Sequence, residues 1–286
     1  MKITKAIFPA AGFGTRFLPA TKAIPKEMLP LVDKPLIQYA VEEAKDSGLE
    51  EMIIVTGMGK TAIEDHFDTS VELELLLKKR NKKEILRMIE KVSDLVHFSY
   101  TRQKEPLGLG HAILITKNLI RDDPFAVFLG DDIIDSKVPV MKQMIRVFRK
   151  YPASILAVQK VPRKDARLYG VIKGKRVAPG LYRVEDLVEK PKKNPPSNLA
   201  IIGRYILSPG IFAALEGTRP GKGGELQLTD GLRTLLKTEP VYAYEFKGER
   251  FDAGDKLGFI KANVAFALKR PDLRVELRKF LKGLVA

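Results

Sequence analysis

The sequence predicts an α/β fold in which helices flank a mixed, mainly parallel sheet, and three observations support this prediction. Apolar segments of strand length alternate with amphipathic helical segments through the first half of the chain, an order that builds a parallel sheet. A glycine-containing loop, residues 10–16, follows the first apolar segment. Short β-rich pieces with turn residues occupy about residues 169–205, which predicts a small antiparallel β subregion. The expected architecture is Rossmann-like.

The first half of the chain begins with an uninterrupted apolar run at residues 3–8, which is typical of a buried strand. Residues 36–47 place apolar side chains on one helical face, and Gly48 can end that helix in the left-handed conformation. Thr61 is expected to cap the next helix, with Glu64 completing a capping box. Further strands are expected at residues 52–56, 96–101, 125–129 and 154–161, and further helices at 62–67, 72–91, 110–117 and 140–150.

The second half of the chain ends in helices. After the β subregion, helices are expected at residues 209–215 and 226–237, followed by a strand at 241–246. The spacing of apolar residues predicts two C-terminal helices, at 256–268 and 273–284. The apolar face of the last helix could pack on its own domain or on a partner subunit, and we expect a homo-oligomer, either a dimer or a tetramer.

The composition excludes several functional classes. The 286 residues are 45% hydrophobic and 30% charged, as in an ordinary globular protein. The chain has no cysteine, so thiolate metal sites and thiol catalysis are excluded, and a cytoplasmic location is expected. No apolar run has the length of a membrane span. Pro9 and Gly12 interrupt the N-terminal apolar run too early for a signal peptide.

The net charge of +15 favours a polyanionic partner such as a nucleotide, a nucleic acid or an acidic membrane surface. The basic residues are spread along the chain, and no cluster of basic and aromatic residues marks a nucleic-acid surface. We therefore expect neither a nucleic acid nor a membrane as partner. A basic nucleic-acid-binding protein remains the alternative from a different functional class.

The loop after the first strand suits a polyphosphate. Its small residues leave backbone N–H groups accessible at Ala10, Ala11, Gly12, Gly14 and Thr15, and cations follow at Arg16, Lys22 and Lys26. The loop is not a dinucleotide fingerprint, because Phe17 stands where the third glycine belongs. Residues 57–61 imitate a Walker loop, but Ile54 stands where its first glycine belongs.

Polar residues also follow the ends of several expected strands, and ligands bind at that edge of an open α/β sheet. Asp131 and Asp252 are candidate ligands for Mg²⁺, which favours carboxylate oxygens. Each has a structural alternative, since Asp131 could cap a turn and the segment Asp252–Asp255 could provide N-caps for the helix from residue 256. Asp132, Asp135 or Asp255 could share the metal.

Two further groups have binding interpretations. Lys190 could meet a phosphate at a strand end while Glu189 accepts hydrogen bonds from hydroxyl groups; the alternative is a solvated lysine. Gln103 and the segment from Gly108 could bind a base edge, or could simply form a turn and the start of a helix.

Several motifs together carry a family resemblance. They are Pro9–Gly12, Ala20–Tyr39, Gly108–Ala112, Glu189–Pro191, Pro196–Ala200 and Glu225–Asp230. With these motifs the chain resembles, over nearly its whole length, the bacterial UTP–glucose-1-phosphate uridylyltransferases, a family of sugar-phosphate nucleotidyltransferases. Gly130 departs from the proline of close relatives, but glycine before the aspartate also fits sister enzymes.

The resemblance implies that glucose 1-phosphate attacks the α-phosphorus of UTP, giving UDP-glucose and pyrophosphate with Mg²⁺ as cofactor. It also implies one nucleotidyltransferase domain over residues 1–286, with a sugar-binding β subregion at about 169–205 and C-terminal helices at about 256–284. The implied roles are Arg16 and Lys26 on the triphosphate, Gln103 and Gly108 on uracil, Lys190 on the sugar phosphate, Gly170, Glu189 and Glu225 around the sugar, and Asp131 and Asp252 on the metal.

The chemistry itself needs no general base, because a phosphate monoester has its second pKa near about 6 and is ionised at neutral pH. The task is to bring anions together, which cations and a metal ion can do. Sister enzymes that use dTTP or ATP are the closest alternatives, and the segment from Lys22 to Met28 argues against them.

Overall fold

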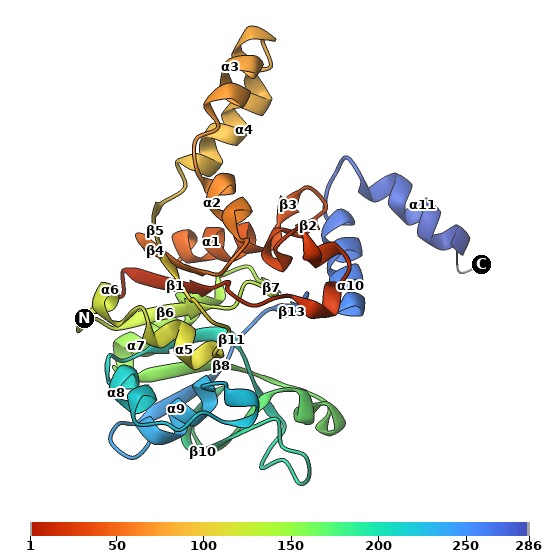
Figure 1. Ribbon diagram of the computed structural model, residues 1–286. Helices are drawn as coiled ribbons and strands as arrows, with labels where there is room; N and C mark the ends of the chain where they lie inside the picture. The colour runs from red at the N-terminus through yellow and green to blue at the C-terminus, as the bar shows by residue number, and fades with distance from the viewer. Residues whose placement is uncertain (1, 285–286) are drawn as a thin grey trace.

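A central nine-stranded sheet organises the computed structural model, which describes residues 2–284 (Figure 1). In spatial order its strands are β5 (His97–Arg102), β4 (Glu51–Thr56), β1 (Lys5–Pro9), β6 (Phe125–Phe128), β11 (Leu199–Leu207), β8 (Ser154–Lys160), β12 (Val241–Glu245), β10 (Leu181–Glu189) and β9 (Gly170–Ala178). The predicted mixed α/β, Rossmann-like architecture is confirmed.

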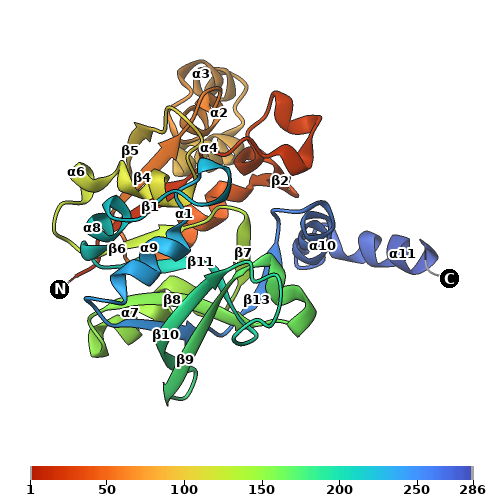
Figure 2. The ribbon, with the colours of Figure 1, turned by 60° about the horizontal axis from the view of Figure 1, so that its bottom comes forward.

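Parallel and antiparallel pairings occupy different parts of this sheet. Strands β5, β4, β1 and β6 are mutually parallel, and β12 is parallel to β8. Strand β11 runs antiparallel to both β6 and β8, so it joins the two parallel groups. The expected antiparallel subregion, β9 and β10, continues the same sheet through β12 (Figure 2). Antiparallel pairing therefore takes a larger share than the sequence indicated.

Helices cover both faces of the sheet because neighbouring residues of each strand point to opposite sides. On one face, Phe8 belongs to the core that includes α1 (Leu36–Asp46), α2 (Thr61–Phe67) and α7 (Val140–Lys150). On the other face, Ile7 belongs to the core that includes α5 (Leu109–Leu114), α6 (Lys117–Ile120), α8 (Gly210–Glu216) and α9 (Leu228–Leu235). Burial on both faces explains why the strands read as continuous apolar runs.

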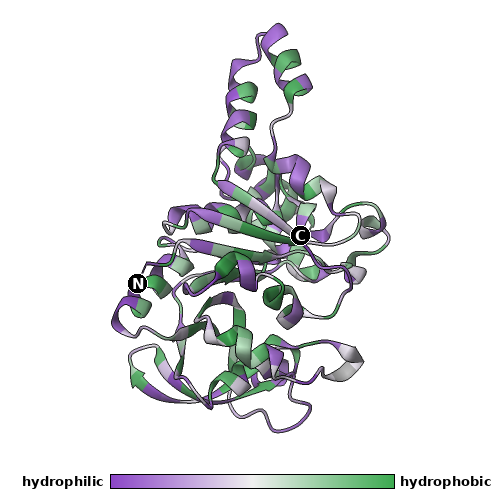
Figure 3. Ribbon diagram, turned by 60° about the vertical axis from the view of Figure 1, so that its left-hand side comes forward, coloured by the Kyte–Doolittle hydropathy of each residue, from purple (hydrophilic) through white to green (hydrophobic). Residues whose placement is uncertain are grey.

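Three details of the first half differ from the sequence prediction. The helix expected at residues 110–117 is two short helices, α5 and α6. The expected helix at residues 72–91 is a pair of helices, α3 (Val71–Lys79) and α4 (Lys83–Ser93), separated at Asn81, whose φ is 52°. This pair projects from the body and carries both hydrophilic and hydrophobic colours (Figures 1 and 3). The capping box at Thr61 and Glu64 was wrong, because α2 begins at Thr61 and Lys60 occupies the cap position without a side-chain hydrogen bond.

Short elements complete the fold. Two small antiparallel sheets, β7 (Asp132–Asp135) with β13 (Glu249–Asp252) and β2 (Pro30–Leu31) with β3 (Lys34–Pro35), were not predicted. The 3-10 helices are Thr15–Phe17, Ala20–Lys22, Lys26–Met28, Arg163–Leu168 and Lys222–Gly224.

At the end of the chain, α10 (Lys256–Ala267) is followed by α11 (Arg274–Leu284), which buries none of its residues. Within residues 2–284, no helix has both the length and the apolar character needed to cross a membrane.

Candidate active site

The loop after β1 lies at the carboxyl edge of the sheet and is held by the conformation of Gly14 and by side-chain hydrogen bonds. Gly14 has φ 64°, a left-handed conformation that favours glycine, and precedes the 3-10 helix Thr15–Phe17. The Thr21 hydroxyl donates to the Gly14 carbonyl at 2.8 Å. A Cβ at Gly14 would lie 3.0 Å from Lys26 Cβ, so the absence of a side chain there brings the loop against Lys26. Arg16 donates from Nη1 to the Gly254 carbonyl at 2.9 Å.

Lys26 and Asp131 form an ion pair across this edge, with Nζ 2.6 Å from Oδ2. Burial lowers the pKa of Lys26, but the Asp131 and Glu27 carboxylates together outweigh burial and leave the pKa of the ammonium above its usual value. Burial likewise raises the pKa of Asp131, and the Lys26 ammonium overcomes it and holds that pKa below its usual value. Both groups are therefore charged at neutral pH.

Asp131 and Asp252 converge on the space beside Gly254. A Cβ on Gly254 would lie 2.9 Å from Asp131 Oδ2 and 3.1 Å from Asp252 Oδ1. The Ala253 N–H donates to the Asp131 carbonyl at 2.8 Å, and the Gly254 N–H donates to Asp252 Oδ1 at 3.1 Å. The structure thus brings together two carboxylates that are distant in sequence, and glycine leaves the space between them open.

The other three aspartates weighed as metal ligands are engaged elsewhere. Asp132 accepts from the Gly203 N–H at 2.8 Å and pairs with Arg250, and burial raises the pKa of Asp132 although Arg250 opposes the shift. Asp135 pairs with Lys269. Asp255 caps α10 by accepting from the N–H groups of residues 257 and 258, as the capping alternative predicted for this segment.

The predicted base-binding residues also lie together. Gln103 follows β5 and donates from Nε2 to the Gly108 carbonyl at 3.1 Å. Gly108 has φ 93°, and a Cβ there would lie 2.9 Å from the Leu226 carbonyl oxygen. The Gly110 N–H donates to that oxygen at 2.8 Å, and the Leu226 N–H donates to the Leu107 carbonyl at 2.7 Å. This loop is therefore bonded directly to the segment that carries Glu225.

A cavity of about 270 Å³ gathers the four residues predicted for the sugar phosphate, Gly170, Glu189, Lys190 and Glu225. The Lys190 side chain is 59% exposed, and its Nζ lies 3.5 Å from Glu189 Oε1. The other Glu189 oxygen accepts from the Thr229 hydroxyl at 2.6 Å. A Cβ on Gly170 would lie 3.1 Å from that oxygen, so only glycine leaves the Glu189 carboxylate accessible from this side.

Sequence reasoning missed Arg250, which lines the same cavity. Arg250 donates from Nη2 to Asp252 Oδ2 at 2.9 Å and from Nη1 to the Tyr169 hydroxyl at 3.2 Å, and its Nε pairs with Asp132. A lone arginine in a short, unpredicted strand gives no sequence signal. Only the antiparallel pairing of β7 with β13 places it beside Asp132.

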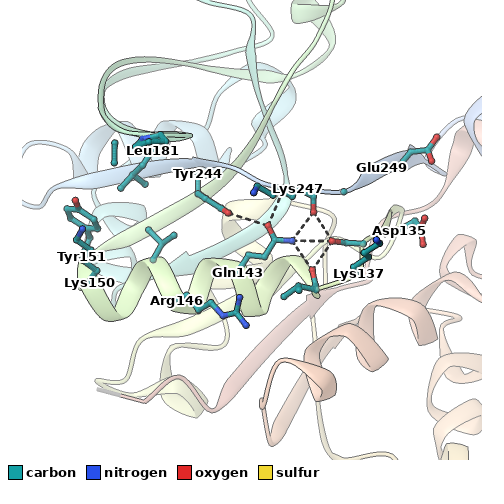
Figure 4. A pocket seen from close by; sticks show the side chains of 16 residues that line it. Asp135, Lys137, Gln143, Arg146, Lys150, Tyr151, Leu181, Tyr244, Lys247 and Glu249 are labelled. Carbon is teal, nitrogen blue, oxygen red and sulfur yellow. Dashed lines mark hydrogen bonds between the residues drawn. The ribbon is translucent and has the colours of Figure 1, made fainter.

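The larger cavity in Figure 4, about 780 Å³, lies away from these groups. It is bordered by α7 and by the connection from β12 to β13, and Gln143 bonds its walls together through Ser136, Val138 and Lys247. Apart from Asp135, none of the described residues that line it was weighed as a site residue. Size therefore does not identify the active site here; the convergence of charged groups does.

Comparison with known proteins places this geometry in a family. Residues 5–268 match the family described as nucleotidyl transferase. The chain belongs to the nucleotidyl transferase family. Relatives named UTP–glucose-1-phosphate uridylyltransferase are 51% identical in Staphylococcus epidermidis, over 99% of both chains, and in Bacillus subtilis, over 99% of this chain and 98% of the relative. The predicted family and enzyme class are confirmed.

Solved structures of nucleotidyl transferases superpose over most of the chain. A UDP-glucose pyrophosphorylase complexed with UDP-glucose has 51% identity and a TM-score of 0.87, covering 94% of this chain and all of that one. A UTP-bound enzyme from Acinetobacter baumannii has 38% identity and a TM-score of 0.91, covering 98% and 99%. Nucleotidyl transferases generally use a divalent metal ion, which agrees with the convergent carboxylates.

Proposed function

We propose that this chain transfers the uridylyl group of UTP to glucose 1-phosphate, giving UDP-glucose and pyrophosphate. The position of Arg250 carries the proposal. Its guanidinium lines the cavity shared by Glu189 and Lys190 and also donates to Asp252, one of the carboxylates beside Gly254. One side chain therefore joins the part of the site suited to a sugar phosphate to the part suited to a metal-bound triphosphate.

The proposed roles follow the two halves of the site. Backbone N–H groups of residues 11–15, with Arg16 and Lys26, bind the triphosphate, while Gln103 and Gly108 contact uracil. The N–H of Ala10, which was also predicted to bind, instead donates to the Val55 carbonyl at 2.9 Å. Gly170, Glu189 and Glu225 surround the sugar, and Lys190 binds its phosphate. The sugar phosphate is already ionised near neutral pH, since its second pKa is about 6, so the chain supplies position and charge and needs no general base.

Charge is the main obstacle to this reaction. Two unit charges about 4 Å apart interact by roughly 4 kcal/mol at an effective dielectric of about 20, so two phosphates repel each other strongly before attack. Arg16 and Lys26 on one substrate and Lys190 on the other offset that repulsion. The loop and the cavity then hold the attacking oxygen in line with the bond that breaks.

We propose Mg²⁺ as the cofactor, held by Asp131 and Asp252. Support comes from the open space beside Gly254 on which both carboxylates converge. Mg²⁺ is commonly bound by one or two carboxylates together with substrate phosphates and water. Two carboxylates therefore suffice, although no group of three or more candidate ligands occurs in the described part of the chain. When bound, the ion supplies charge neutralisation and orients the phosphates.

We also propose that residues 1–286 act as one domain in a homo-oligomer in the cytoplasm, where nucleoside triphosphates are made. The continuity of the sheet from β5 to β9 supports a single domain. Exposed apolar side chains on the outlying helices, including Leu75, Met88 and Phe280, support self-association. Sedimentation of the purified protein as a monomer at micromolar concentration would contradict the oligomer.

The deciding experiment is an assay of pyrophosphate release from UTP, dTTP, ATP, CTP or GTP, each with glucose 1-phosphate or galactose 1-phosphate. We expect the highest kcat/KM with UTP and glucose 1-phosphate, and loss of turnover when EDTA removes divalent ions. A preference for dTTP or ATP would instead assign one of the sister activities. Tight binding to single-stranded nucleic acid without turnover would favour the alternative class.

A further inference from the structure

A buried ion pair links the segment after β4 to the 3-10 helix Lys26–Met28, which follows the loop at residues 10–16, called the triphosphate loop below. Lys60 Nζ donates to Glu27 Oε2 at 2.7 Å, and the two residues are only 7% and 2% exposed. Lys60 lies in the segment that imitates a Walker loop, residues 57–61, just after β4. The Lys60 ammonium therefore has a protein carboxylate as its partner.

Glu27 links three parts of the site. It stands next to Lys26 in the 3-10 helix Lys26–Met28, and the two side chains diverge, one to Lys60 and the other to Asp131. A Cβ on Gly130, the residue before Asp131, would lie 3.9 Å from Glu27 Cγ. The Lys60–Glu27 pair thus fixes the backbone from which Lys26 extends.

The loop that carries Lys60 also touches the triphosphate loop itself. A Cβ on Gly57 would lie 3.0 Å from the Ala11 carbonyl oxygen, so the loop after β4 packs against the loop after β1 without space for a side chain. Because β1 and β4 are parallel neighbours, both loops leave the sheet at the same edge. Lys60 therefore connects one loop to the helix that follows the other.

Stability alone does not account for this pair. Removing two charges from water costs several kcal/mol per ion, and well-packed apolar residues in place of a buried ion pair are often neutral or stabilising. Moreover, Glu27 Oε1 has no hydrogen-bond partner in the described residues, so the carboxylate is only partly satisfied. A buried ion pair is therefore weak evidence for a stabilising role, and an orienting role is the alternative.

We propose that Lys60 and Glu27 are positioning residues for the triphosphate, holding Lys26 in the orientation that UTP binding requires. This inference rests on the proposed function, which supplies both UTP as the triphosphate and Lys26 as one of the groups that bind it. It assigns a role to Lys60, which lies outside the predicted binding motifs. Because neither Lys60 nor Glu27 lines the cavity around Glu189, the pair should affect binding of the triphosphate and not of the sugar phosphate.

The decisive variant removes both charges at once. Glu27→Leu with Lys60→Met leaves no unpaired buried charge, so the protein should fold with a thermal midpoint near that of the wild type. We expect calorimetric UTP affinity to fall by about tenfold to a hundredfold, as for a displaced binding group, while the KM for glucose 1-phosphate stays within about twofold. Unchanged UTP affinity in the folded double variant would overturn the proposal.

Single variants and a control sharpen the result. Lys60→Arg keeps the cation and should recover most of the UTP affinity, whereas Lys60→Met alone should lose both affinity and stability. Lys117→Met removes one member of an exposed pair with Glu216, also 2.7 Å apart, and should leave UTP binding unchanged. Equal loss of affinity for both substrates would indicate general damage and contradict a positioning role.

Assays of the wild-type protein distinguish a wrong substrate from a wrong positioning role. If the wild type turns over another nucleoside triphosphate in preference to UTP, the proposed substrate is wrong. The same variants are then compared on the preferred triphosphate, where the selective loss of its affinity is still expected. If that affinity is retained, the positioning role fails independently of the substrate.

Discussion

Lys26 Nζ lies 2.6 Å from Asp131 Oδ2, so a lysine proposed to bind the triphosphate neutralises an aspartate proposed to bind the metal. Each group holds the other in its charged form, as the directions of their two pKa shifts indicate. The Lys26–Asp131 pair is consequently neutral as a whole before any substrate binds. Phosphates and a metal ion can replace this contact without leaving either side chain uncompensated.

Lys26→Met tests that balance. We expect turnover to fall by at least about a hundredfold, since a transition-state charge contact of this kind is worth roughly 2.7–4 kcal/mol. The Asp131 carboxylate also loses its counter-ion. Steady-state kinetics in the presence of saturating Mg²⁺ measure the effect, and Lys45→Met on the exposed face of α1 serves as the matched control. Turnover within about twofold of the wild type would remove Lys26 from the mechanism.

Lys190→Ala should lower turnover by orders of magnitude while leaving the fold intact. The side chain is 59% exposed, so its loss creates no cavity. Its substitution removes the cation nearest the predicted sugar phosphate. Kinetics with varied glucose 1-phosphate, together with thermal unfolding, separate the two effects. Lys192→Ala, an exposed lysine two residues away, should behave as the wild type, and near-normal turnover of Lys190→Ala would contradict its role.

Arg250→Leu should destabilise the protein as well as inactivate it. Removing one partner of a buried ion pair typically costs about 3–5 kcal/mol, because the remaining charge is uncompensated. Here Asp132 would be left buried beside Asp252. Urea unfolding measures the loss, and the double variant Arg250→Leu with Asp132→Asn should recover part of it. No change in the unfolding free energy would show that Arg250 is dispensable for the fold.

Gly254→Ala should weaken activation by Mg²⁺. The new Cβ would lie 2.9 Å from Asp131 Oδ2 and 3.1 Å from Asp252 Oδ1, which is closer than ordinary contact. We expect a higher Mg²⁺ concentration at half-maximal activity, with folding retained. Gly217→Ala is the matched control, because its Cβ would meet no atom closer than 3.6 Å. An unchanged Mg²⁺ dependence would place the metal elsewhere.

His66 gives the fold a predictable pH dependence. Burial lowers the pKa of His66 below its usual value of about 6.5, so the unfolded chain binds a proton at a higher pH than the folded chain does. The stability contribution is complete above pH about 6.5 and is lost as pH falls through the folded pKa. Urea unfolding at pH 7.5 and 5.5 should show a smaller loss for His66→Gln than for the wild type, with His97→Gln as the exposed control.

Local patterns were sufficient to predict the main helices and strands. Helix α7 begins and ends where its apolar spacing indicated, at Val140 and Lys150, and α1 differs by one residue. The strands buried on both faces were equally clear. The break between α3 and α4 was missed because Asn81 adopts its positive φ in a segment whose charges suit a helix throughout. Strands of two or four residues are too short for any periodicity to appear.

The site residues that belong to sequence motifs could be predicted. The residues that reach the site only through tertiary contacts could not. Residues 10–12, Lys26, Glu189, Lys190 and Glu225 lie in the motifs that carry the family resemblance, although their roles remain predictions. Arg250 and Lys60 have no such motif. Their partners, Asp132 and Glu27, lie far away in sequence, and a buried ion pair is a property of the folded chain that no local pattern records.

The position of β11 between β6 and β8 has a consequence for synthesis of the protein. While the ribosome is still producing residues before 199, β6 and β8 each expose an edge that β11 will later cover. Unpaired apolar edges invite association between nascent chains. Ribosome-stalled chains of increasing length should therefore gain protease resistance abruptly once β11 has emerged, and a gradual gain would argue that the earlier strands fold independently.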